Sequence, residues 1–342
     1  MATHRLTDFL PRLVRREDLT RDEAFELLEA LLDPEATDAQ ISGALVALAA
    51  KGETIEELAG MAEGLRSRAT RVISQHRCFI DTAGTGSSRA KTFNISTAAA
   101  FVIAGAGLPV AKHGNRAASS KAGSADLLTA LGVNVSAIPL VSENALNEIG
   151  ICFMFAPLYH GATARVAGIR RQLGIHTTFN LLGPLSNPAG APRQIIGVWR
   201  LELAEKLARV LGELGTERAW VVHGEDGLDE ITLAGKTHVA EAQNGSVKTF
   251  DIGPGDFGFE AGTLEHLRGG DAEANARIVS AVLSGERKDE ARTLVIMNAA
   301  AALFLGGSAA DLRDGAMIAA NSIDSGVARH KLELLIDATS GP

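Results

Sequence analysis

Cysteine and aromatic residues are scarce in this chain of 342 residues. It contains two cysteines, two tryptophans and one tyrosine, and aromatic side chains make up only 4% of the sequence. So few thiols argue against a secreted scaffold held by disulfides. They favour a reducing compartment, in which Cys78 and Cys152 are ordinary core residues. The scarcity of large rings, together with frequent alanine and glycine, suits closely packed helices.

Long hydrophobic runs are also missing. The longest apolar stretch, residues 98–111, is short for a membrane span, which needs about 20 residues, and it is better explained as a buried helix followed by a buried strand. Residues 1–18 mix arginines with acids and lack the apolar core of a secretory signal. We therefore expect a soluble, cytoplasmic protein that has no membrane partner.

An excess of positive charge is absent as well. The formal net charge is −8, which argues against a general nucleic-acid binder and leads us to expect no nucleic-acid partner. Because 46% of the residues are hydrophobic and only 22% are charged, the chain can bury a large core as one large or two medium domains.

Periodic apolar residues predict a helical unit near the N-terminus and an α/β unit after it. Helical patterns cover residues 21–32, 38–50 and 54–69, and two of them follow threonines with capping-box spacing, Thr20 and Thr54. From about residue 78, short β-rich runs alternate with helical ones, which predicts a largely parallel sheet. The β-rich runs are FIDTAG, LPVAKHG, GICFMFAP, RQIIGVW, AWVVHG and KTFDI.

Three features that favour phosphate binding follow one another within residues 81–126. A glycine turn, Gly84-Thr85-Gly86, lets backbone N–H groups approach an anion. Asn94, Ser96 and Thr97 stand where a helix begins, and a helix N-terminus favours an anion. The KHGNR loop then adds Lys112, His113 and Arg116. A single such feature is most often an ordinary tight turn or helix cap, but the succession predicts a site for a doubly phosphorylated small molecule.

Two further motifs carry charged groups suited to binding. The segment 223–230, HGEDGLDE, places four acids within six residues after an apolar run, which makes a Mg²⁺ site plausible beside a phosphate site, although an isolated acidic turn is usually solvated. The segment 168–174, GIRRQLG, offers guanidinium groups that can bind a carboxylate with two hydrogen bonds, although tandem arginines on a helix are usually surface charges.

Five blocks of sequence resemble the anthranilate phosphoribosyltransferase family, in its order and at about its spacing. They are TFNIST, KHGNR with the following SSKAGSADLL, FNLLGPLSNPAG, VVHGEDGLDEIT and NAAAAL, and the resemblance runs nearly end to end. It implies an α/β fold of the nucleoside phosphorylase and phosphoribosyltransferase class, with a small discontinuous helical domain and a larger α/β domain with a mainly parallel sheet. The helical domain would comprise residues 1–72 and a helical excursion near 166–186, and the α/β domain residues 73–342. The resemblance also implies an active site in the cleft between them and a homodimer formed through the helical domain.

The resemblance further implies the reaction and the residues that serve it. The 5-phosphoribosyl group of phosphoribosyl pyrophosphate would pass to the amine of anthranilate, with Mg²⁺ as cofactor and no general acid or base. The residues implied to bind phosphoribosyl pyrophosphate are Gly84, Ser87, Ser88, Thr92, Asn94, Ile95, Ser96, Thr97, Lys112, Ser120 and Ser124. Those implied to bind anthranilate are Gly84, His113, Asn115 and Arg170, and those implied to hold the metal are Ser96, Asp229 and Glu230.

Three departures from the family pattern leave the acceptor open. Ser87, Ser88 and Arg89 replace Gly, Asp and Gly of the family's GTGGDG turn. Gly161-Ala162-Thr163 stands where the family has PAM after a histidine, and His176 stands where it often has arginine. A paralogue with another aromatic acceptor is therefore an alternative. A catalytically inactive family member that binds nucleic acid is disfavoured by the acidic pair and the negative net charge. A pyrimidine nucleoside phosphorylase is disfavoured because the FNLLGPLSNPAG block and Arg170 follow the anthranilate pattern.

Overall fold

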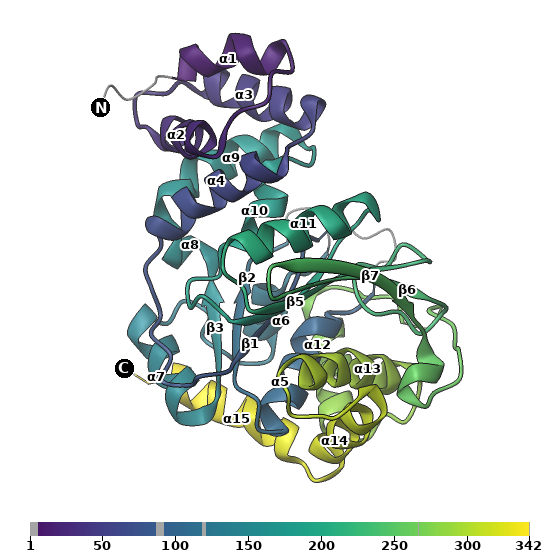
Figure 1. Ribbon diagram of the computed structural model, residues 1–342. Coiled ribbons are helices and arrows are strands. Elements are labelled where there is room, and N and C mark those ends of the chain that lie inside the picture. Colours follow the sequence, from purple (N-terminus) through teal and green to yellow (C-terminus); the bar gives the residue numbers. More distant parts are fainter. Residues whose placement is uncertain (1–5, 87–91, 118–120, 266, 342) are drawn as a thin grey trace.

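The computed structural model describes residues 6–86, 92–117, 121–265 and 267–341, and it places a group of helices above a sheet that is covered by helices on both faces (Figure 1). The predicted helices and strands fall close to the observed ones. Within the described part of the chain, no helix has the length and the apolar character that a membrane span requires.

The upper group of helices, which we call the helical unit, is assembled from two separate parts of the chain. The three predicted N-terminal helices are confirmed within about two residues, and the capping boxes at Thr20 and Thr54 are formed. A third box, formed by Thr37 and Gln40, begins the helix between them. The unit comprises α1 (Leu6–Val14), α2 (Arg21–Leu32), α3 (Asp38–Lys51), α4 (Ile55–Ser67), α9 (Ala164–Leu173) and α10 (Thr178–Leu185).

The described residues form one seven-stranded sheet in the order β3-β2-β1-β4-β5-β6-β7. The first five of these strands pair in parallel, and β6 and β7 add an antiparallel edge, which confirms the expectation of a mainly parallel sheet. The strands are β1 (Ile80–Gly84), β2 (Val110–Gly114), β3 (Ile151–Phe155), β4 (Arg193–Gly197), β5 (Arg218–Gly224), β6 (Thr237–Gln243) and β7 (Ser246–Ile252).

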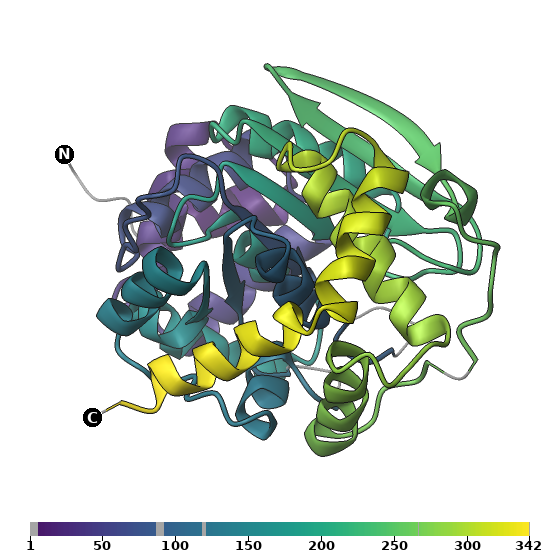
Figure 2. The ribbon, with the colours of Figure 1, turned by 90° about the horizontal axis from the view of Figure 1, so that it is seen from below.

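Helices cover the two faces of the sheet unequally. Helix α11 (Glu202–Glu213) lies between the sheet and the helical unit, whereas a larger group of helices covers the opposite face (Figures 1 and 2). The second group includes α5 (Ile95–Gly105), α12 (Ala272–Leu283), α13 (Glu290–Leu305), α14 (Leu312–Asp324) and α15 (Val327–Thr339). Shorter helices α6 (Ser124–Ala130), α7 (Pro139–Ile149) and α8 (Ala156–Tyr159) connect the parallel strands on the β3 side. Helix α5 and strand β2 are the predicted buried helix and strand of residues 98–111.

Two hydrophobic cores fill the molecule, one on each side of the sheet. One core joins α5, α13 and α15 to the lower face. The other begins in the helical unit at Leu27, continues through Leu182 of α10 and Leu211 of α11, and reaches Val221 of β5. The helical unit therefore shares its core with one face of the sheet, and the division of the chain at residue 72 stays a prediction.

The chain crosses between the helical unit and the sheet three times. The crossings are residues 68–79, 160–163 and 186–192. The first crossing bonds to the residue that precedes the second crossing and to the third, because the Thr70 N–H donates to the Tyr159 carbonyl at 3.0 Å and the Val72 N–H donates to the Pro188 carbonyl at 3.3 Å. The three crossings thus run side by side.

Candidate active site

The candidate site lies where the order of the parallel strands reverses, between β1 and β4. From β1 the chain continues to β2 and β3 on one side, and then returns to β4 on the other. Ligands of open α/β sheets bind beyond the carboxyl ends of the strands at such a point. Gly84 and Gly197 are register partners at this edge, and the Thr85 N–H donates to the Gly197 carbonyl at 2.9 Å.

The acidic segment packs directly on these two glycines. A methyl group added to Gly84 would come within 3.3 Å of the Asp229 carboxylate, and one added to Gly197 would overlap the Asp229 backbone carbonyl. The position of Gly197 therefore requires glycine if Asp229 is to lie above the strand ends, whereas a side chain at Gly84 would make a tight contact with the Asp229 carboxylate. The next residue, Glu230, accepts a hydrogen bond from the backbone N–H of Ser96 at 3.2 Å. The predicted metal ligands Ser96, Asp229 and Glu230 are thus brought together.

The electrostatics of this acidic pair favour a bound cation. The pKa of Glu230 is raised to about 8, first because removal from water disfavours its charged form and then because Asp229 adds a second negative charge. Two carboxylates and a hydroxyl form a set of oxygen ligands that Mg²⁺ accepts when substrate phosphates and water complete its coordination. Within the described ranges, no three or more His, Cys, Asp or Glu side chains are grouped closely enough to hold a metal by themselves. The residues therefore fit Mg²⁺ that is shared with a phosphorylated substrate.

Lys112 points into the protein and not towards a free loop. Its ammonium group donates to the Thr82 backbone carbonyl and lies 3.4 Å from the Ser96 hydroxyl, and the residue is 4% exposed. Burial lowers its pKa, while the negative charges of Asp81 and Glu230 oppose that shift. Lys112 therefore links β1 to the start of α5 and supplies positive charge beneath the acidic pair.

The start of α5 is formed as expected, with Asn94 as the residue before its first turn. The Asn94 side chain does not cap the helix, because it donates to the Ala122 carbonyl at 3.3 Å and accepts from Asn275 at 3.0 Å. Ile95 and Thr97 are almost fully buried, so the part of each residue nearest a ligand is its backbone. Thr92 pairs with Arg268 in an isolated antiparallel bridge next to this helix start.

Two histidines lie together at the carboxyl end of β2: His113 belongs to the strand, and His160 follows α8. The rings of His113 and His160 meet edge to face, with centroids 5.2 Å apart. His113 Nδ1 donates to the Gly183 carbonyl at 3.2 Å and His160 Nε2 donates to the Ser186 carbonyl at 3.1 Å. The other ring nitrogen of each, His113 Nε2 and His160 Nδ1, is buried without a hydrogen-bond partner among the described residues.

Burial holds both rings in the neutral form. The pKa of His113 is lowered to about 3 by burial first and by His160 second, and the pKa of His160 is also lowered by burial. Each unpartnered nitrogen is therefore a hydrogen-bond acceptor. A role for His160 was not predicted from the sequence. The departure from the family pattern at Gly161–Thr163, directly after His160, was the only signal near it.

Arg170 has a free hydrogen-bond donor in the same region. Its Nη2 donates to Asn180 at 3.1 Å and its guanidinium lies 5.6 Å from the centre of the Phe179 ring. Its Nε is buried and has no partner in the described part of the chain, and burial lowers the pKa of the group. No acidic side chain is recorded as its ion-pair partner there. An unpaired, half-buried guanidinium is suited to an anionic ligand.

The remaining predicted residues are divided between the described and the undescribed parts of the chain. Asn115 is exposed after β2, where its side chain accepts from the Arg116 N–H at 2.8 Å and its carbonyl accepts from the Ser124 hydroxyl at 3.3 Å. The predicted residues Ser87, Ser88 and Ser120, and the departure at Arg89, lie outside the described residues. Of the other departures, Gly161–Thr163 forms a short 3₁₀ turn. The ring of His176 stacks on Trp199, with the ring centroids 4.5 Å apart.

A helical unit, a mainly parallel sheet and an acidic pair beside a helix N-terminus together define a phosphate-handling transferase of the two-part glycosyl transferase type. Family models agree with this class. Residues 7–69 match the glycosyl transferase family helical bundle domain, and residues 76–329 match the glycosyl transferase family a/b domain.

Individual relatives make the assignment more specific, and the chain belongs to the anthranilate phosphoribosyltransferase family. The enzyme of that name from Anaeromyxobacter dehalogenans (strain 2CP-C) is 52% identical over 97% of this chain and 98% of its own length. The crystal structure of the Thermus thermophilus enzyme superposes with a TM-score of 0.92 at 40% identity, covering 98% of this chain and all of that one. The Saccharomyces cerevisiae enzyme in complex with PRPP and Mg superposes with a TM-score of 0.90 at 29% identity, covering 98% of each chain.

Proposed function

We propose that this protein transfers the 5-phosphoribosyl group of phosphoribosyl pyrophosphate to the amine of anthranilate and releases pyrophosphate. One observation carries the proposal: Asp229 and Glu230 lie on the paired glycines Gly84 and Gly197, beside the first N–H groups of α5. This arrangement joins carboxylates for a divalent cation to backbone N–H groups for phosphate at the carboxyl ends of the strands.

The donor would lie over the acidic pair and the start of α5. We assign Ser96, Asp229 and Glu230 to Mg²⁺. The backbone of residues 94–97, the glycine turn and Thr92 are assigned to the phosphates, together with Ser87, Ser88, Ser120 and Ser124. Bound Mg²⁺ offsets the negative charge that develops on pyrophosphate as the glycosidic bond breaks. Lys112 contributes positive charge from below, and its contacts with Thr82 and Ser96 link the strand end to the helix start.

The acceptor would lie between Arg170 and the two histidines. We assign Arg170 to the carboxylate of anthranilate, because its guanidinium has an unpartnered buried Nε. We assign the acceptor nitrogens of His113 and His160 to the N–H groups of the arylamine, with Asn115 and Gly84 nearby. An arylamine is neutral at pH 7 and already has a free lone pair. The enzyme therefore needs no general base, and catalysis comes from positioning and from stabilisation of the leaving group.

The reaction is tested by following the fluorescence of anthranilate with purified protein, phosphoribosyl pyrophosphate and Mg²⁺. We expect a loss of signal that requires all three and is abolished in the Asp229→Ala, Glu230→Ala double variant. The matched control is Glu225→Ala, which removes an exposed acid of the same loop. Asp226 is kept because its carboxylate accepts from the Leu228 N–H and the Thr232 hydroxyl. Release of pyrophosphate with another aromatic amine, and none with anthranilate, would contradict the proposed acceptor.

We also propose a homodimer formed through the helical unit. Two apolar side chains of this unit are exposed, Val14 at 73% and Val46 at 42%, and would be covered in such a dimer. Light scattering on the full chain is expected to give twice the monomer mass of 35.7 kDa. The Val14→Asp, Val46→Asp variant is expected to shift that mass towards the monomer, and an unchanged dimer would place the interface elsewhere.

A further inference from the structure

A cavity that is open to solvent lies at the amino ends of the strands, opposite the edge of the sheet that carries the candidate active site. It has a volume of about 430 Å³ and is lined by residues at the amino ends of β1 and β4, including Phe79 and Pro192. All of its described lining residues belong to two of the three crossings, residues 68–79 and 186–192, except Arg66, which lies near the end of α4. A volume of this size is within the range of small-molecule sites, roughly 300–1,000 Å³.

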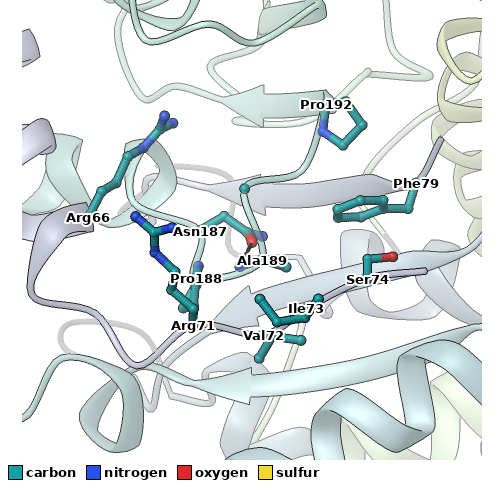
Figure 3. A pocket seen from close by; sticks show the side chains of 11 residues that line it. Arg66, Arg71, Val72, Ile73, Ser74, Phe79, Asn187, Pro188, Ala189 and Pro192 are labelled. Carbon is teal, nitrogen blue, oxygen red and sulfur yellow. Dashed lines mark hydrogen bonds between the residues drawn. The ribbon is translucent and has the colours of Figure 1, made fainter. Parts of the chain in front are cut away.

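The lining is charged at one end and apolar at the other. In Figure 3, Arg66 and Arg71 lie on one side of the cavity and Phe79 and Pro192 on the other, with Val72 and Ile73 between them. The described residues that line the cavity include no Asp or Glu. The lining therefore presents two positive charges together with an apolar surface.

Neither guanidinium has an ion-pair partner among the described residues, although the negative charge of Glu63 acts on Arg66 and raises its pKa against the effect of burial. Arg66 donates from Nε to the Leu185 carbonyl at 2.7 Å and from Nη1 to the Leu214 carbonyl at 3.1 Å, so it satisfies carbonyl groups at the ends of α10 and α11. Its Nη2 has no hydrogen-bond partner among the described residues. Burial lowers the pKa of Arg66 to about 10, so the group is still charged at pH 7. Arg71 is exposed and has no ion pair or hydrogen bond within the described ranges.

We propose that this cavity is a second ligand site, which binds a small organic carboxylate with an apolar ring. The carboxylate would lie between Arg66 and Arg71, where two guanidinium groups can each donate to an oxygen. The ring would lie against Ile73, which is 61% exposed, and against the half-buried Ala189 and Pro192. The site is separate from the cleft that holds Asp229, and its existence does not rest on the proposed transfer reaction.

One wall residue connects the cavity to the acceptor region. Asn187 Nδ2 donates to the Asp81 carboxylate at 2.7 Å and to the Ala111 carbonyl at 2.8 Å. The other oxygen of Asp81 accepts from the backbone N–H of His113 at 3.2 Å. An occupant that touches Asn187 is therefore two hydrogen bonds away from a residue of the candidate acceptor site.

The test uses fluorine NMR of 6-fluoro-2-naphthoate, with the neutral 6-fluoro-2-naphthamide as a matched probe. Because an aromatic carboxylate can also enter the acceptor cleft, binding is measured in the full-length Arg170→Ala variant. We expect binding of the naphthoate in this background, at least tenfold tighter than that of the amide. A carboxylate that binds no more tightly than the amide would overturn the assignment of an anionic ligand.

Two further substitutions test whether the naphthoate binds in this cavity. Added to Arg170→Ala, Arg71→Ala removes the exposed cation and Ala189→Trp fills the cavity. Each is expected to weaken naphthoate binding at least tenfold. Arg77→Ala, an exposed arginine of the same crossing that does not line the cavity, is expected to change it less than twofold. Thermal unfolding verifies that each variant is folded. No binding in the Arg170→Ala background, or equal effects of Arg71→Ala and Arg77→Ala, would overturn the proposal.

Discussion

At the scale of single residues, the site depends on side chains whose polar atoms lack partners within the protein. Arg170 is the clearest example. It is half-buried, its Nε has no partner in the described part of the chain, and it is fixed by Asn180 and Phe179. Such a group costs stability unless a ligand satisfies it, so its presence is better explained by binding than by folding.

Replacing Arg170 by alanine is expected to affect the acceptor more than the donor. The loss of a charge-assisted hydrogen bond, worth about 1.5–3 kcal/mol, predicts that KM for anthranilate rises at least tenfold while KM for phosphoribosyl pyrophosphate changes less than threefold. Steady-state kinetics with each substrate varied in turn measures this split. Arg171→Ala removes the exposed neighbouring arginine and serves as the control. Equal increases in both KM values would contradict the assignment.

His113 gives the stability of the protein a specific dependence on pH. Its folded pKa of about 3 lies below the usual value of 6.5, so the unfolded chain binds more protons between these values and stability falls as pH decreases through them. Between pH 7 and pH 5 this residue alone is expected to remove about 2 kcal/mol from the free energy of unfolding. Asp81, whose pKa is raised to about 6 by burial, acts in the opposite direction, because its folded form gains a proton first.

The contribution of His113 is separated by comparison with His113→Asn. Urea unfolding at pH 7 and pH 5 is expected to show a smaller loss of stability on acidification in the variant than in the parent. Asp81, His160 and Lys112 are present in both proteins, so their effects are common to the two curves. A variant that loses as much stability as the parent would show that the ring of His113 is already accessible to protons.

The sequence predicted these residues unequally well. Local patterns marked an acidic segment, a helix start and a pair of arginines, and the family resemblance then implied Asp229, Glu230, Ser96 and Arg170 within them. The contact between His113 and His160 could not be predicted by this route, since it joins residues 47 positions apart whose rings meet only after β2 and β3 have paired. Similarly, the sequence placed Lys112 in a basic loop, whereas burial in β2 turns its ammonium group inwards.

At the scale of secondary-structure elements, the paired glycines at the ends of β1 and β4 determine how closely the acidic segment can approach. Only the absence of a side chain at Gly197 leaves room for the Asp229 backbone. The sequence predicted both strands but not this contact, because it depends on how the segment after β5 folds back across two neighbouring strands.

We expect Gly197→Ala to displace the acidic segment and to lower kcat/KM by about a hundredfold, since a displacement of about 1 Å at a reacting centre costs that much. Activity measurements with a thermal melt establish whether the effect is local. Gly212→Ala is the matched control, because a methyl group at this position of α11 meets no atom within 4 Å. Normal activity in Gly197→Ala would show that the acidic segment has another position compatible with catalysis.

The elements that were missed have identifiable causes. Helix α1 lies in a stretch that mixes arginines with acids and contains Pro11, which obscured its apolar face. Strand β6 is interrupted by polar residues such as Glu241, which is buried because Arg218, Trp220 and Lys248 all bond to it. Periodicity alone does not reveal a buried carboxylate that is satisfied by three partners.

At the scale of the whole molecule, the core of the helical unit is built from segments that lie far apart in the sequence. Val166, Ile169 and Leu182 complete a core that otherwise comes from the first 65 residues, and this core continues to the sheet. The predicted helical excursion near 166–186 corresponds to α9 and α10, whereas the continuity of the core with α11 and β5 was beyond what local patterns could indicate.

A fragment of residues 1–72 is therefore expected to lack a cooperative unfolding transition. Removing α9, α10 and α11 exposes the apolar face of α2–α4, and a segment of this length is marginally stable even with a complete core. Circular dichroism during thermal unfolding tests this expectation, with the full chain as the control. A sharp transition in the fragment would show that the four N-terminal helices suffice for folding.

The bonds that hold the three crossings together also restrict how the molecule can deform. Because Thr70 bonds to Tyr159, directly before the second crossing, and Val72 bonds to Pro188 of the third, the described links between the helical unit and the sheet lie next to one another. A unit that is joined through neighbouring stretches of chain can rotate about them as about a hinge, whereas sliding and twisting are restricted. Because the helical unit also shares its core with α11 and β5, we expect this rotation to be small, and it would carry Arg170 towards or away from the acidic pair.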